Sequence, residues 1–258
     1  MRPFYNPDNK PLFIAENTLY QVGCFTVIIP SLLISESVKT MFLYTLDQFS
    51  NSDLVKQIIV IDNTKDKCIG KKLGVISNKI KIIDDQPDLY FNPALNYGIR
   101  FCDTEYYLMT SDDFLCHKII VDDFYNVFQK EKNIGLLQVN TDRGTENDIE
   151  NYDTYFRKEY PRKTVYHDSF ELLGGVMVGY TKDWIDIPED LKIFCGDSMV
   201  QFVSHLRNQR MFKIVSSYVL HYCSATTSQP EIMNYSEVLE KERIIYEKLQ
   251  IQLRKEIK

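Results

Sequence analysis

Two adjacent carboxylates, Asp112 and Asp113, are the residues of this 258-residue chain whose type and position point most directly to chemistry. They follow residues 106–110, an apolar run with the composition of a buried strand. The carboxyl end of such a strand is where open α/β sheets bind their ligands. Mg²⁺ is typically held there by one or two carboxylates together with the phosphates of a substrate. The pair therefore predicts a divalent cation that bridges to a diphosphate.

A purely structural role is the alternative for the same two residues. Residues 114–130 carry Ile120, Phe124 and Val127 at helical spacing. Ser and Asp are favoured at the beginning of a helix, where they cap backbone N–H groups and complement the helix dipole. Under this alternative Asp112 and Asp113 would only cap the helix, so the neighbouring segments must decide between the two roles.

The elements that must position these carboxylates show the rhythm of a parallel sheet. Residues 25–29 and 57–61 are runs of β-branched and apolar residues, which fit buried parallel strands, and residues 80–83 form a third. An amphipathic helix capped by Ser35 is expected between the first two. This order predicts a doubly wound α/β sheet whose polar strand ends share one edge. The turn after the first strand lacks the glycines of a dinucleotide-binding fingerprint, which disfavours that function.

Four segments, at residues 25–30, 60–66, 92–99 and 106–113, resemble in order and spacing the successive signatures of GT-A-fold nucleotide-sugar glycosyltransferases, and of glycosyltransferase family 2 in particular. The resemblance implies a GT-A, Rossmann-like α/β fold with a mostly parallel sheet flanked by helices. It also implies roles for six donor-site residues, which are Pro30 in the first turn, Asp62 and Asn63 at the nucleotide base, Asn96 in the nucleotide pocket, Asp112 at the ribose or the sugar, and Asp113 as a metal ligand.

The chain departs from the family pattern at three points of this donor half. Ser31 and the two leucines after it stand where the family usually has Thr-Tyr-Asn. Asn63 replaces the second acid of the usual pair after the second strand, and Ser111 replaces the first acid of the D-x-D motif. These differences bear on the identity of the nucleotide more than on the fold.

In the second half of the chain the resemblance implies the acceptor site and the general base. Gly174 and Gly175 would border the acceptor site, where glycine allows close approach of a ligand to the backbone. Asp197 matches the Asp of the family's Gly-Glu-Asp segment, the general base, although Gly196 replaces the Glu and Asp197 could instead cap the helix that follows. His221 follows the last predicted strand and would complete the metal or diphosphate site.

Together these residues predict a metal-dependent glycosyltransferase. The expected donor is a UDP-sugar, the cofactor Mn²⁺ or Mg²⁺, and the acceptor a hydroxyl group attacked in a single, inverting displacement. A nucleotidyl transferase is disfavoured because no glycine-rich turn follows Ile29. A catalytically silent nucleotide- or carbohydrate-binding module is the other alternative, and it would have no chemical need for Asp197 and His221.

Residues 140–168 form a long polar stretch without a clean period, which predicts a lid or a binding loop. Its aromatic residues alternate with Arg and Lys, a combination that stacks on sugars or bases and also suits phosphate backbones. A solvated loop anchored by its tyrosines is the structural alternative. The acceptor therefore stays open between a glycan, a lipid-linked sugar, a protein and a modified DNA base, the last as in phage enzymes that glycosylate hydroxymethylated DNA.

Composition indicates an ordinary globular protein with one α/β domain. The net charge of -6 gives no overall attraction to nucleic acid, and the six cysteines form no C-x-x-C pair. The first residues lack the apolar core of a signal peptide, and no apolar run is long enough for a transmembrane segment, so we expect a cytoplasmic protein. We divide the chain into a nucleotide-sugar-binding half (1–113), an acceptor-binding half (114–233) and a charged C-terminal helix (234–258). That helix is expected to pack on the domain or on a second copy of the chain in a homodimer.

Overall fold

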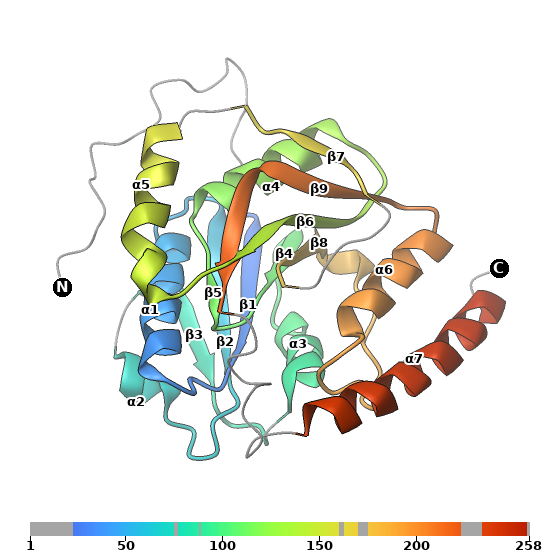
Figure 1. Cartoon of the computed structure of the whole chain (residues 1–258). Helices are drawn as coiled ribbons and strands as arrows, with labels where there is room; N and C mark the ends of the chain where they lie inside the picture. Colours follow the sequence, from blue (N-terminus) through green and yellow to red (C-terminus); the bar gives the residue numbers. More distant parts are fainter. Residues whose placement is uncertain are drawn as a thin grey trace.

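A sheet of nine strands forms the centre of the computed structural model, which describes residues 23–74, 77–87, 89–159, 163–169, 175–222 and 234–256 (Figure 1). The strands are β1 Phe25–Ser31, β2 Val55–Asp62, β3 Ile80–Ile83, β4 Tyr106–Met109, β5 Phe114–Leu115, β6 Ile134–Arg143, β7 Tyr166–Asp168, β8 Met177–Tyr180 and β9 Arg210–His221. Their order in the sheet is β3-β2-β1-β4-β8-β6-β9-β5, and β7 pairs with β9 beside this path.

Most strands of the sheet run in one direction, as predicted, and β5, β7 and β8 run in the opposite one. β1 pairs in parallel with β2 and β4, β2 with β3, and β6 with β9, whereas β8, between β4 and β6, is antiparallel to both. The register places Ser31 at the end of β1 opposite Asp62 at the end of β2. The polar strand ends therefore meet at one edge of the sheet, where the site is expected.

Helices cover both faces of the sheet. The α-helices are α1 Glu36–Ser50, α2 Ile69–Leu73, α3 Phe91–Ile99, α4 Ile119–Lys130, α5 Ile149–Glu159, α6 Gly196–Leu206 and α7 Tyr235–Glu256, with 3₁₀ turns η1 Glu146–Asp148 and η2 Thr181–Asp183. Side chains of β1 alternate between the two faces: Val27 and Ile29 belong to the apolar cluster under α1 and α4, and Ile28 to the one under α3 and α6. This is why the whole strand is buried and reads as a continuous apolar run.

The C-terminal helix α7 packs back on the domain. Ile245, Leu249 and Leu253 lie on the cluster under α3 and α6, and the Tyr246 hydroxyl donates to the carbonyl of Ser198 at 3.0 Å. Figure 1 shows α7 alongside α3 and α6. Within the described residues, no helix is both long and apolar enough to cross a bilayer.

The helix predicted for residues 114–130 begins only at Ile119, and the capping role considered for the two carboxylates is therefore wrong. Residues 114–115 form β5, which pairs antiparallel with β9. The N-cap of α4 is Lys118, whose side chain makes no capping hydrogen bond, and the Ile119 N–H donates to Nδ1 of His117 at 3.2 Å. Asp112 and Asp113 consequently lie in the turn between β4 and β5, and neither caps α4.

The prediction of a long loop at residues 140–168 is also wrong. β6 continues to Arg143, and α5 follows after η1. Tyr152 and Phe156 point inward and are 1% and 0% exposed, whereas Tyr155 is 38% exposed. Two of the aromatic residues that suggested a ligand-binding surface thus belong to the core.

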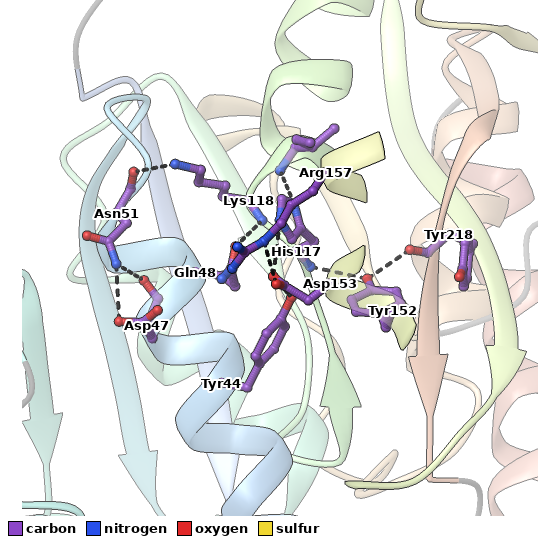
Figure 2. A network of polar contacts seen from close by, with 11 residues as sticks. Tyr44, Asp47, Gln48, Asn51, His117, Lys118, Tyr152, Asp153, Arg157 and Tyr218 are labelled. Carbon is purple, nitrogen blue, oxygen red and sulfur yellow. Dashed lines mark hydrogen bonds and ion pairs between the residues drawn. The ribbon is translucent and has the colours of Figure 1, made fainter. Parts of the chain in front are cut away.

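A polar network holds α5 in place (Figure 2). The Tyr152 hydroxyl donates to the carbonyl of Tyr218 at 2.9 Å and accepts from the backbone N–H of His117 at 3.2 Å. Asp153 accepts from the Tyr44 hydroxyl at 3.2 Å and pairs with Arg157 at 2.6 Å. α5 is therefore fastened to α1, β9 and the start of α4.

Candidate active site

A cavity of about 600 Å³ opens at the edge of the sheet where β1, β2 and β4 end. The turn after β1, Asn63 after β2 and residues 111–113 after β4 form one side. Tyr90 and Phe91, at the start of α3, lie beside Asn63. The remaining lining residues are Asp190, Lys192 and Ile193 before α6, and Asn234, Val238, Lys241 and Glu242 at the start of α7. Segments from the whole length of the domain therefore enclose one site.

Asp112 fastens the turn after β1 to the end of β4. Its Oδ2 accepts from the Ser31 hydroxyl at 2.6 Å and from the backbone N–H groups of Leu32 and Leu33 at 3.0 and 2.8 Å. These bonds hold Leu33 in a left-handed conformation with φ of 48°. Burial, and secondly the charge of Asp113, raise the pKa of Asp112 to about 6 despite the three donors. All three of these bonds use Oδ2, and the side chain still lines the cavity.

Asp113 and His221 meet in the structure as the resemblance implied. His221 Nε2 lies 3.3 Å from Asp113 Oδ2, and Ser111 donates to Asp113 Oδ1. The imidazole stacks on the Phe114 ring with centroids 4.0 Å apart, and the Tyr222 N–H donates to the carbonyl of Asp113 at 2.9 Å. Ser111 and the Phe114 ring thus hold the two side chains in place, with their polar atoms close together.

This pair fits a divalent cation. Ligand distances of about 2.0–2.1 Å place neighbouring ligands of an octahedral Mg²⁺ about 3 Å apart, close to the observed separation. Among the residues that the structure describes, no cluster of three or more His, Cys, Asp or Glu side chains is arranged to hold a metal. Asp113 and His221 would therefore supply two positions, and water and phosphate oxygens the others, as is common for Mg²⁺.

Asp62 and Asn96, two of the residues predicted for the nucleotide-sugar site, bond to the backbone of the protein itself. Asp62 is fully buried, and its carboxylate accepts from the N–H groups of Thr64 and Ile69 at 2.9 and 2.8 Å, which shapes the loop that leads to α2. Asn96 exchanges two hydrogen bonds with the backbone of Ile187, at 2.6 and 2.9 Å. Neither is among the described residues lining the cavity.

Asn63 and Pro30 do line the cavity. The Asn63 amide donates to the carbonyl of Tyr90 at 2.8 Å, and Tyr90 has a positive φ of 57°. Tyr90 is 46% exposed and places its ring at the cavity, although no motif singled it out. Strained non-glycine residues gather at functional sites, so the positive φ is the structural signal that the sequence could not provide.

The glycines predicted at the acceptor site are only partly described. Gly174 lies outside the described residues. Gly175 has φ of 140°, and a Cβ there would lie 2.7 Å from the Phe114 ring. Since Phe114 stacks on His221, Gly175 allows the chain to close behind the candidate metal ligand.

Asp197 lies in the first turn of α6 and is half-buried. It is not one of the described residues that line the cavity. Gly196 before it permits close contact, because a Cβ at this position would overlap the Asn92 amide. The Glu of the family pattern could not fit here without moving Asn92, which explains this departure.

No family model matches the chain, and no curated protein does either. Solved structures similar to it include three of TarS 1–349 from S. aureus. The structure in complex with UDP has a TM-score of 0.51 at 15% identity and covers 90% of this chain and 70% of TarS. The complex with UDP-GlcNAc has a TM-score of 0.52 at 14% identity and covers 90% and 71%. A third TarS structure has a TM-score of 0.49 at 15% identity and covers 74% and 57%.

At this level of identity the likeness to TarS concerns the fold. The α/β class predicted from the sequence, with a mostly parallel sheet flanked by helices, is confirmed. Across the three structures the chain spans between 57% and 71% of the TarS length. Membership of glycosyltransferase family 2 stays a prediction.

Proposed function

We propose that this chain transfers a sugar from a UDP-sugar to a hydroxyl acceptor with the help of Mn²⁺ or Mg²⁺. The observation that carries the proposal is the cavity at the carboxyl edge of the sheet, which Asp112 and Asp113 line. His221 does not line this cavity, but its Nε2 lies 3.3 Å from Asp113 Oδ2. The cavity volume of about 600 Å³ lies within the range of small-molecule sites. The similar fold of TarS, which is seen in complex with UDP-GlcNAc, supports the same class of ligand.

In this proposal Asp113 and His221 hold the cation, which when bound offsets the negative charge on the departing diphosphate. Asp112 keeps the turn after β1 rigid through Oδ2 and faces the ribose or the sugar. Asn63 and Pro30 border the nucleotide. Asp62 and Asn96 contribute by fixing the loops behind that wall.

Asp197 is proposed as the general base. A carboxylate that accepts the proton of the attacking hydroxyl raises its nucleophilicity in the transition state. Asp197 lies in the first turn of α6, after the cavity-lining Ile193, and is not among the described residues that line the cavity, so we assign it to the acceptor and not to the donor. Attack on the face opposite the diphosphate would invert the anomeric configuration.

The acceptor is proposed only as a hydroxyl compound. The burial of Tyr152 and Phe156 removes two of the aromatic residues that favoured a DNA acceptor. A glycan is consistent with the net charge of -6, which gives no general attraction to a polyanion.

The test is a thermal-shift and turnover screen with UDP, GDP, ADP, CDP and their sugars, in Mn²⁺, in Mg²⁺ and in chelator. A ligand of the folded state raises its stability by about 2.7 kcal/mol at a hundred times Kd. We expect stabilisation by UDP-sugars that depends on the cation, and slow release of UDP when water acts as the acceptor. Binding without any release of UDP, across a panel of hydroxyl acceptors, would favour the silent binding module. A folded protein that no nucleotide stabilises would overturn the proposal.

A further inference from the structure

The positively charged residues of the cavity come from the segment before α6 and from α7. Lys192, in the segment before α6, and Lys241, in α7, are the Lys or Arg residues among the described residues that line the cavity. Both side chains are exposed, and neither belongs to a motif that the sequence singled out. The Lys192 ammonium lies 4.4 Å from the centre of the Tyr90 ring, which places it on the side of the cavity shared with Asn63.

Glu242 joins the two elements that bear these lysines. Its carboxylate accepts from three successive backbone N–H groups, those of Lys192 at 3.0 Å, Ile193 at 3.2 Å and Phe194 at 2.7 Å. It is 2% exposed, although it belongs to the charged helix α7. On the other side, the carbonyl of Lys192 accepts from the Asn92 N–H at 2.9 Å. The backbone of residues 192–194 is therefore fixed to α7 on one side and to the start of α3 on the other.

The negative charge of the cavity must be offset by the two lysines if a diphosphate is to bind. Asp112, Asp113 and Asp190 line it and would repel a diphosphate, whereas the charge of Glu242 is offset by its three N–H donors. Phosphate oxygens bind where ammonium or guanidinium groups, or a cation, offset their charge. A cation at Asp113 and His221 would supply one side of that balance, and the two lysines the other.

We propose that Lys192 and Lys241 form an anion subsite that binds the diphosphate of the donor, and that Glu242 is the positioning residue that holds the subsite together. α7 is then a wall of the donor site and more than a cover for the core. The inference rests on the proposed function for the identity of the ligand, but the subsite itself can be tested with pyrophosphate alone.

The experiment compares the unchanged 258-residue chain with its Lys192→Ala and Lys241→Ala variants, in calorimetric titrations with UDP, uridine and pyrophosphate, each in Mn²⁺ and in chelator. Lys248→Ala is the matched control, because Lys248 is exposed on the same helix and does not line the cavity. We expect each cavity variant to weaken UDP and pyrophosphate about tenfold, the effect of one lost charged hydrogen bond. Uridine affinity and the Lys248→Ala protein should stay as in the wild type.

Three outcomes separate the two proposals. If the wild type binds UDP and both lysine variants bind it equally well, the subsite is wrong and the proposed function stands. If the variants weaken uridine as much as UDP, the lysines support the fold and not the phosphates, which also overturns the subsite. If the wild type binds pyrophosphate through the lysines but no nucleotide, the proposed function fails and the subsite stands.

The role of Glu242 needs its own measurement. Glu242→Gln keeps the size of the side chain but removes its charge, and the amide nitrogen cannot accept from an N–H group. We expect weaker pyrophosphate binding in the wild-type background and no further weakening once both lysines are alanine. Equal and additive losses in both backgrounds would show that Glu242 only stabilises the fold.

Discussion

His221 Nε2 lies 3.3 Å from Asp113 Oδ2, although 108 positions separate the two residues in the chain. The antiparallel pairing of β5 with β9 produces this contact, because it sets Phe114 directly opposite His221. The carboxylate that precedes Phe114 is thereby brought to the imidazole. The short strand β5 thus joins the two halves of the candidate metal site.

His221→Ala should abolish the part of donor binding that depends on the cation. The variant loses one of two protein ligands, so Mn²⁺ should no longer increase the affinity for UDP, whereas affinity in chelator should be unchanged. Asp113→Asn should behave in the same way. Titration of UDP with and without Mn²⁺ measures both, and His205→Ala, an exposed histidine of α6, is the control. A full Mn²⁺ effect in the His221→Ala protein would contradict the assignment.

Gly175→Ala should destabilise the protein and weaken the metal site together. The new Cβ would lie 2.7 Å from the Phe114 ring, which supports His221, and a φ of 140° is unfavourable for alanine. We expect a loss of about 1–3 kcal/mol in the free energy of unfolding and a lower affinity for Mn²⁺. Gly74→Ala separates strain from contact, since Gly74 has φ of 70° with nothing within 4 Å. Chemical denaturation should therefore show a smaller loss for Gly74→Ala, and its Mn²⁺ affinity should not change.

The sheet could be predicted from the sequence because buried parallel strands leave a strong local pattern. Residues 25–29 and 58–61 are mostly apolar runs, and both are buried on the two faces of the sheet. The pairing of Asp113 with His221 has no local signal, and only the family resemblance suggested it. α5 was missed because a window of polar residues hid Tyr152 and Phe156, whose spacing of four positions is helical.

Glu242 shows why the part of the site built by α7 and the segment before α6 could not be predicted. In the sequence it is one of several Glu residues on the polar side of a charged helix, and such residues are usually exposed. Its burial depends on three N–H groups from residues about 50 positions earlier. Lys192 and Lys241 likewise acquire a shared role only when the domain is folded.

Tyr152→Phe should lower stability without affecting donor binding. Its hydroxyl donates to the carbonyl of Tyr218 and accepts from the N–H of His117, so its removal leaves two buried backbone groups without this partner (Figure 2). We expect a loss of about 1–3 kcal/mol in the free energy of unfolding. Urea denaturation measures this loss, and Tyr155→Phe, on the exposed side of α5, is the control. Unchanged stability would show that the network does not hold α5.

Deprotonation of Asp112 should lower the free energy of unfolding, measured in chelator, as the pH rises from about 4 to about 6. Burial and the neighbouring Asp113 raise the pKa of Asp112 from 3.8 to about 6, so the folded state binds a proton that the unfolded state has already released. The contribution is complete below pH 4 and is lost above pH 6, and it is on the order of 3 kcal/mol. Burial also raises the pKa of Asp122, to about 7, which adds a decrease of its own, so the comparison is with Asp112→Asn. That variant should lack the share of the decrease that Asp112 contributes, and an identical pH profile would contradict the raised pKa of Asp112.

Asp197→Asn should slow transfer while leaving donor binding intact. As a general base Asp197 would contribute about 10²- to 10⁴-fold to kcat, and because it does not line the described cavity the Kd for UDP should not change. A role only at the beginning of α6 predicts the opposite result, namely a loss of about 0.3–1 kcal/mol in stability with normal kcat per folded molecule. His205→Ala, at an exposed position of the same helix, is the control for disturbance of the helix, because the Ser198 hydroxyl donates to Asp197 at 3.5 Å and Ser198→Ala would disturb the proposed base itself. Steady-state turnover and calorimetry on the same samples distinguish the two roles. Loss of a general base lowers kcat and leaves the Kd for UDP unchanged, whereas loss of a helix-end charge lowers stability and leaves kcat unchanged.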